Sequence, residues 1–120
     1  MIDPAEIMAR TTVEEICAGA EAYFSSITDP GFHERNPFSS PDDAAALLDE
    51  VGLLLRGLHL TPGMRVLDLG AGTAWLSRFL NKLVGRVTAC DPSKTALEIG
   101  RRTTARLPFE APDRLTVEVD

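Results

Sequence analysis

Hydrophobic residues in the first sixty positions recur every three or four places, which is the period of amphipathic helices. The first such segment starts after Thr12, where T-V-E-E has the form of a capping box, and should end before the turn signal at 29–31. A second segment starts at Ser40 and carries an apolar stripe from Leu47 to Leu58. Residues 31–40 show no period, so we expect an irregular segment there.

The pattern changes after Thr61. Met64 to Leu69 is apolar except for one acid and one base, which predicts a strand buried on both faces. Leucines and a phenylalanine at helical spacing over 76–83 predict a helix that is capped by Gly85. Residues 86–91 then predict a second strand.

The last part of the chain repeats this alternation. Ser93 is a helix-capping residue, and the helix that follows should run to about Arg106. Apolar residues alternate with polar ones from Leu115 to Val119, which predicts a third strand at a sheet edge. Strand, helix, strand, helix, strand is the order of a parallel sheet with right-handed crossovers. We therefore expect an α/β fold, with a helical cap segment at 1–60 and a Rossmann-like sheet at 61–120 whose first strand lies inside.

Composition and charge limit the classes of function that this chain can have. The 120 residues carry a net charge of −6, which argues against binding to nucleic acid or to an anionic membrane surface. Neither a signal peptide nor an apolar run of membrane-spanning length is present. Cys17 and Cys90 have no metal-site spacing, and we expect two buried, reduced thiols, no bound metal and a cytoplasmic location.

The candidate chemistry lies in the turn Gly70-Ala71-Gly72-Thr73-Ala74-Trp75. A dinucleotide fingerprint, G-x-G-x-x-G, would need glycine where Trp75 stands. Asp68 is a second objection, because a carboxylate two residues before the first glycine would repel a pyrophosphate. S-adenosylmethionine has no phosphate, and the ammonium group at its methionyl end would be attracted to that carboxylate. Asp91, at the end of the second strand, can accept hydrogen bonds from both ribose hydroxyls, although it could also simply cap the next helix.

These two stretches, VLDLGAGTA and VTACDPS, resemble motif I and the following acidic motif of class I S-adenosylmethionine-dependent methyltransferases. The resemblance implies that Asp68 and the 70–74 turn hold the methionyl part, that Asp91 holds the ribose, and that Pro92 and Ser93 lie beside the adenine. The implied cofactor-binding residues are Asp68, Gly70, Ala71, Gly72, Asp91, Pro92 and Ser93.

The resemblance also sets how much of the domain to expect. The family sheet has seven strands in the order 3-2-1-4-5-7-6, and this chain has the pattern of strands 1–3, preceded by N-terminal helices. We therefore expect the N-terminal half of a methyltransferase, truncated and inactive alone, with Asp120 a weak candidate for the adenine amino group. A chain of only 120 residues would expose the apolar edge of strand one and self-associate through it.

The expected activity is transfer of a methyl group to a small molecule, by direct attack of a nucleophile on the sulfonium methyl. One alternative is a truncated, non-catalytic homologue that binds S-adenosylmethionine or a partner chain; an NAD-dependent oxidoreductase is a weaker one. Neither the methyl acceptor nor a catalytic residue is identified by the sequence.

We expect His33 to be a solvated loop residue rather than a general base, and His59 to lie at a helix end. Four aromatic residues either form a lid over the cofactor or pack the helices on the sheet: Tyr23, Phe24, Phe32 and Phe38.

Overall fold

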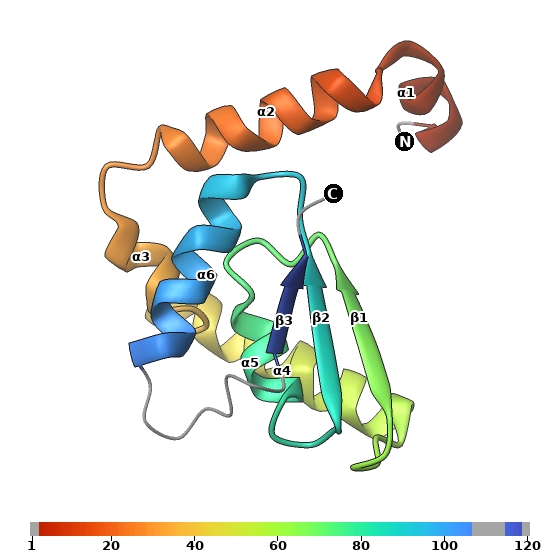
Figure 1. Cartoon of the computed structure of the whole chain (residues 1–120), viewed down its shortest axis with the longest axis vertical. Helices are drawn as coiled ribbons and strands as arrows, with labels where there is room; N and C mark the ends of the chain where they lie inside the picture. The colour runs from red at the N-terminus through yellow and green to blue at the C-terminus, as the bar shows by residue number, and fades with distance from the viewer. Residues whose placement is uncertain (1–2, 107–114, 119–120) are drawn as a thin grey trace.

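The computed structural model describes residues 3–106 and 115–118, which form helices around one small sheet (Figure 1). The elements follow one another along the chain as α1 (Pro4–Arg10), α2 (Val13–Ser25), α3 (Pro30–Glu34), α4 (Pro41–Leu58), β1 (Arg65–Leu69), α5 (Trp75–Leu80), β2 (Arg86–Cys90), α6 (Lys94–Arg106) and β3 (Leu115–Glu118). The helical first part and the alternating second part agree with the expected α/β fold.

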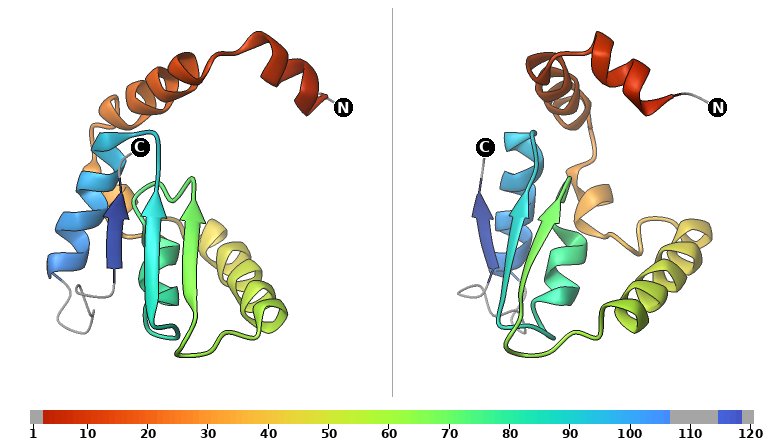
Figure 2. Two further views of the ribbon diagram at one scale, coloured as in Figure 1. Left: turned by 45° about the vertical axis from the view of Figure 1, so that its right-hand side comes forward. Right: turned by 90° about the vertical axis from the view of Figure 1, so that its right-hand side faces the viewer.

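The sheet is parallel throughout, in the order β1-β2-β3. Asp68 in β1 is level with Ala89 in β2, and Leu69 is level with Cys90, so the acid-bearing ends of both strands meet at one edge. The expectation that the third strand lies at a sheet edge is confirmed. Figure 2 shows α5 and α6 on the same side of the sheet.

The core lies between α5, β2 and α4. Leu80, Val84 and Val87 are buried together, and leucines from α4 pack against them. Burying an aliphatic side chain of this size contributes about 1.5–3 kcal/mol. The core therefore holds β2, the central strand, in a fixed position beneath the turns that follow β1 and β2.

β1 differs from its predicted state. Its residues alternate between exposed and half-buried, and Leu67 and Leu69 are 58% and 73% exposed. Within the described residues β1 pairs with β2 alone, so its second edge and one of its faces have no cover. The open edge agrees with the expectation for a chain of 120 residues, whereas the expected burial of both faces is wrong for these residues, because burial depends on neighbours that the strand's own pattern does not supply.

Two local predictions also need correction. The segment after Asp29 is not irregular, because Asp29 accepts a hydrogen bond from the Gly31 amide and starts the short helix α3. Gly85 does not cap a helix, since α5 ends at Leu80. A Cβ at Gly85 would lie 2.6 Å from the Pro62 carbonyl oxygen, so the glycine is needed for close backbone approach.

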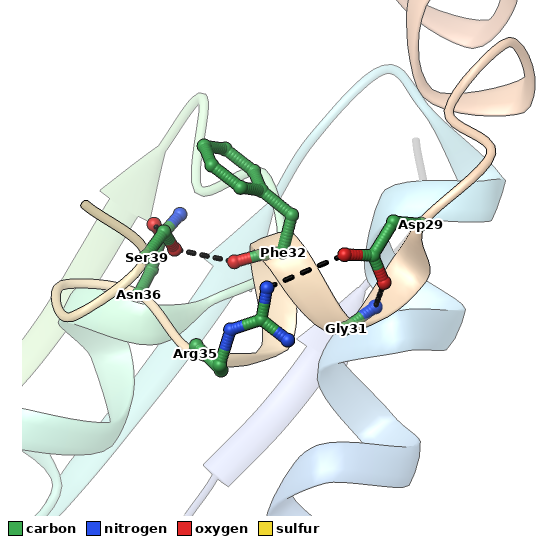
Figure 3. A network of polar contacts seen from close by, with 6 residues as sticks. All are labelled: Asp29, Gly31, Phe32, Arg35, Asn36 and Ser39. Carbon is green, nitrogen blue, oxygen red and sulfur yellow. Dashed lines mark hydrogen bonds and ion pairs between the residues drawn. The ribbon is translucent and has the colours of Figure 1, made fainter.

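Polar contacts connect residues within the segment 29–39, which contains α3 (Figure 3). Arg35 forms an ion pair with Asp29 at 3.3 Å, and the single Ser39 hydroxyl lies within hydrogen-bonding distance of the Phe32 carbonyl and of Asn36 Oδ1. These contacts fold residues 29–39 back on themselves. This segment joins α2 to α4. It lies close to the turn after β1, because the Thr73 hydroxyl of that turn donates to the His33 carbonyl.

Helix α2 crosses the carboxyl ends of the strands and meets the start of α6 (Figure 1). Its capping box is confirmed, because Thr12 and Glu15 exchange the two expected hydrogen bonds. Helix α1 had no predicted counterpart; it begins where Asp3 accepts a hydrogen bond from the Ala5 amide.

Cys17 and Cys90 are half-buried rather than buried, as had been expected from the sequence. Of the helices described, none has the length and apolar character to cross a membrane.

Candidate cofactor-binding site

The turn after β1 depends on left-handed backbone conformations. Gly70 and Gly72 have φ values of 72° and 53°, which glycine adopts without strain. Ala74 also has a positive φ, 56°, and stands immediately before α5. A Cβ at Gly70 would meet no atom within 4 Å, so the space next to this glycine is open. The turn thus leaves its backbone accessible at Gly70.

The amides of this turn point back into the protein. The Gly70 and Ala71 amides both donate to the Cys90 carbonyl, at 2.9 and 3.0 Å, and the Gly72 amide donates to Asp91 Oδ2 at 2.8 Å. A pyrophosphate-binding turn holds its anion with such amides. Here they are already used, which is a structural argument against a dinucleotide and agrees with the objections from Asp68 and Trp75.

Asp91 joins the turns that follow β1 and β2. It is 7% exposed; one carboxylate oxygen accepts from Gly72 and the other from the Ser93 amide, at 2.8 Å. Ser93 in turn caps α6, because its hydroxyl accepts from the Ala96 amide at 3.0 Å. A carboxylate has about four acceptor positions, so Asp91 retains acceptors for a ligand. Shaping the start of α6 and binding a ribose are therefore compatible roles.

Asp68 is half-buried near the end of β1. Its Oδ2 accepts a hydrogen bond from the Ser77 hydroxyl at 2.7 Å, and Ser77 is fully buried in α5. This partner explains how an acid is tolerated in an apolar strand, since a buried carboxylate without a hydrogen bond is costly. The remaining acceptor positions of Asp68 suit a cationic group.

All seven residues predicted to bind the cofactor lie together at the carboxyl ends of β1 and β2. Two of them offer a ligand little beyond their backbone. The Ala71 side chain packs with Ala74 and Ala89, and the Ser93 hydroxyl is occupied within the protein. Pro92 is half-buried between Asp91 and Ser93. The predicted role of Asp120 lies outside the described residues.

Glu21 of α2 is a site residue that the sequence did not indicate. Its carboxylate accepts hydrogen bonds from the Ser93 hydroxyl at 2.8 Å, from the Thr95 amide at 3.2 Å and from the Thr95 hydroxyl. These bonds, first that of the Thr95 side chain, lower the pKa of Glu21 to about 2. No local pattern in α2 distinguishes Glu21 from the other acids of that helix, so the sequence alone held no signal for it.

Aromatic residues gather around His33. Its ring centroid lies 5.2 Å from that of Phe32, 5.5 Å from that of Phe24 and 6.2 Å from that of Tyr23. The His33 carbonyl also accepts from the Thr73 hydroxyl at 3.4 Å. Half-burial lowers the pKa of this imidazole, so the expectation of a solvated loop histidine is wrong. His59 ends α4, as predicted.

The lowered pKa of His33 predicts a pH dependence of stability. Because the folded state binds this proton less readily than the unfolded state, stability should fall as the pH drops below 6.5 towards the lower folded pKa. Thermal unfolding between pH 8 and pH 5 should show this loss, and His33→Asn should flatten the curve. His59→Asn, at an exposed position, should follow the wild type; equal slopes for all three proteins would contradict the prediction.

Comparisons with known proteins agree with this geometry. Residues 66–119 match the sequence model of a family described as a methyltransferase domain. A malonyl-[acyl-carrier protein] O-methyltransferase from Serratia marcescens is 40% identical over 67 residues, which are 55% of this chain and 26% of that enzyme. The chain therefore spans about a quarter of this curated relative.

Solved structures show the same fold. An S-adenosylmethionine-dependent methyltransferase from Geobacter sulfurreducens, solved with S-adenosyl-L-homocysteine, is 26% identical with a TM-score of 0.50; the match covers 60% of this chain and 28% of that one. DhpI, solved as an SAH complex, has a TM-score of 0.62 at 20% identity, with coverage of 91% and 47%. The second match extends to the N-terminal helices, so their placement also has a structural precedent.

Proposed function

We propose that this chain, which belongs to the class I S-adenosylmethionine-dependent methyltransferases, binds S-adenosylmethionine across the ends of β1 and β2 in an enzyme that methylates a small molecule. One observation carries the proposal: the turn after β1 directs its glycine amides into the protein, and an aspartate lies on each side of it. Asp68 and Asp91 provide acceptors at both ends of the site, while the amides of Gly70, Ala71 and Gly72 are occupied within the protein. A cationic, phosphate-free nucleoside fits this donor and acceptor set.

Each residue then has a defined task. Asp68 attracts the ammonium of the methionyl part, and the open backbone at Gly70 allows that part to lie close. Asp91 accepts from the ribose hydroxyls with the lone pairs that Gly72 and Ser93 leave unused. Pro92 and Ser93 border the adenine.

S-adenosylmethionine supplies an electrophilic methyl group on sulfur. The protein contributes mainly orientation, because holding a nucleophile in line with that methyl group replaces a bimolecular encounter by a positioned one. The similar protein from Serratia is by name an O-methyltransferase of a malonyl group, which supports a small group as the methyl acceptor. The proposed site of action is the cytoplasm.

Titration calorimetry on the full-length protein tests the proposal. S-adenosylhomocysteine should bind with a measurable heat, whereas NAD should give none at the same concentration, because its pyrophosphate faces Asp68 and finds the amides of Gly70, Ala71 and Gly72 occupied. Affinity for NAD equal to that for S-adenosylhomocysteine would overturn the assignment of the site.

A second candidate is a homologue that binds the cofactor or a partner chain without catalysis. The open edge of β1, with Leu67 and Leu69 exposed, favours it, because such an edge pairs readily with another strand. We propose that an isolated 1–120 polypeptide self-associates through this edge. Light scattering on the isolated polypeptide tests this self-association, and a stable monomer would contradict it.

A further inference from the structure

Three hydrogen bonds connect Glu21 in α2 with the first residues of α6. Two come from Thr95 and one from the Ser93 hydroxyl, and Ser25 adds a fourth from within α2 at 3.2 Å. Hydrogen bonds to a charged acceptor are stronger than neutral ones, and the pKa of Glu21, near 2, keeps the carboxylate charged at any physiological pH. The contact is thus a fixed, charged connection between residues 74 positions apart.

Besides this contact, the end of α2 is held by aromatic packing of Tyr23 and Phe24 against His33, and its first half has little apolar burial. None of its side chains is fully buried, and Val13 and Ile16, on its first half, are 71% and 49% exposed. Helix α2 nonetheless lies across the carboxyl ends of the strands, where the cofactor site is (Figure 1). A helix with so little apolar burial depends strongly on a few polar contacts for its position.

The same half of α2 that carries Glu21 reaches the glycine turn. Phe24 lies one turn after Glu21, and its Cζ is 3.5 Å from where a Cβ of Gly72 would stand. Phe24 therefore lies in contact with one side of the turn, while the side at Gly70 is open. A ligand that enters or leaves on the Gly72 side of this turn meets Phe24 of α2.

We propose that Glu21 is a positioning residue that latches α2 over the glycine turn, so that exchange of the cofactor requires the contact of Glu21 with Ser93 and Thr95 to break. The proposal rests on the proposed function, since it takes the turn after β1 as the cofactor site. Opening the latch moves Phe24 away from Gly72 and clears the path; closing it retains the bound molecule. The latch acts on passage in both directions, and therefore on rates more than on affinity.

The test compares Glu21→Gln with the wild-type full-length protein by stopped-flow binding of S-adenosylhomocysteine. Loss of the charged acceptor should raise both the association and the dissociation rate constants by on the order of tenfold, with Kd nearly unchanged. Glu14→Gln, an exposed acid at the other end of α2, is the matched control and should change neither rate. A rise in the dissociation rate alone, or rates equal to wild type, would overturn the gating role.

Variants of Thr95, the partner of Glu21, test the same contact from α6. Thr95→Val removes the hydroxyl and keeps the shape, so it should speed exchange, whereas Thr95→Ser keeps the hydroxyl and should restore nearly wild-type rates. The double variant Glu21→Gln/Thr95→Val should be no faster than Glu21→Gln alone, because both changes break one contact. Fully additive effects would mean that the two residues act separately.

A measurement without ligand separates the test of the Glu21 latch from the test of cofactor binding. Hydrogen–deuterium exchange of α2 amides should be faster in Glu21→Gln than in wild type or Glu14→Gln. If S-adenosylhomocysteine fails to bind the wild type, the proposed function is wrong, whereas the exchange data still report on the latch. If exchange in α2 is the same in all three proteins, the latch itself is wrong.

Discussion

Replacing Asp91 by alanine should both destabilise the protein and weaken cofactor binding. The carboxylate is the acceptor for the Gly72 and Ser93 amides in a position that is 7% exposed, so alanine leaves two poorly solvated donors without a partner. Each such loss costs about 1–3 kcal/mol, which predicts a loss of about 3 kcal/mol in the free energy of unfolding. Affinity for S-adenosylhomocysteine should fall by at least about tenfold, because the bonds to the ribose hydroxyls are lost as well.

Denaturant unfolding and calorimetry together separate these effects. Asp91→Asn keeps the size and one acceptor oxygen but turns an NH₂ group towards the other amide, so it should lie between alanine and wild type in stability. Asp49→Ala, at an exposed position of α4, is the control and should change neither quantity. If Asp91→Ala unfolded like the wild type and bound the ligand equally well, both the role of Asp91 in joining the two turns and its ligand role would be refuted.

The second large effect is expected at Gly100, in the middle of α6. A Cβ at this position would lie 2.7 Å from the Thr73 carbonyl oxygen, closer than a carbon atom can approach without movement. The obstacle is backbone of the turn after β1, which is fixed by its bonds to β2. Gly100→Ala should therefore lower the free energy of unfolding by about 1–3 kcal/mol, as overpacking does, and weaken ligand binding by shifting the turn.

Gly52 provides a control of opposite sign. It lies inside α4, and a Cβ there meets no atom within 4 Å, so Gly52→Ala should raise stability by about 0.5–1 kcal/mol through helix propensity. Thermal unfolding of the two variants makes the comparison. Gly100→Ala as stable as Gly52→Ala would show that α6 and the turn are not in the close contact that the structure gives them.

The sequence identified the features of this protein that depend on local pattern. The spacing of Asp68, the glycines and Asp91 predicted two strands whose acid-bearing ends meet, because in a parallel sheet consecutive strands place their carboxyl ends at one edge. Helix starts at Thr12 and Ser40 were predicted from side chains that cap the next few amides, an interaction that spans only three residues.

What the sequence did not identify depends on contacts between distant segments. The partner of Glu21 lies 74 residues away, and that of Asp68 lies across a turn in α5. His33 was predicted to be solvated because it stands beside Glu34 and Arg35 in a segment without a period, yet its neighbours in space are aromatic rings from two helices. The cover of β1 was predicted from its apolar pattern, and such a pattern says that a side chain prefers burial without supplying the partner that buries it.

The inward direction of the turn amides also determines which cellular molecules compete for this site. Adenine nucleotides such as ATP share the adenosine part of the proposed ligand and are abundant, but they carry it on a phosphate chain. The amides of Gly70, Ala71 and Gly72 donate to Cys90 and Asp91, and Asp68 lies in β1 just before this turn, so these three donors are not available to that chain. We therefore expect selection against the nucleotide pool to come from hydrogen-bond donors that the fold already uses, together with repulsion of phosphate by Asp68.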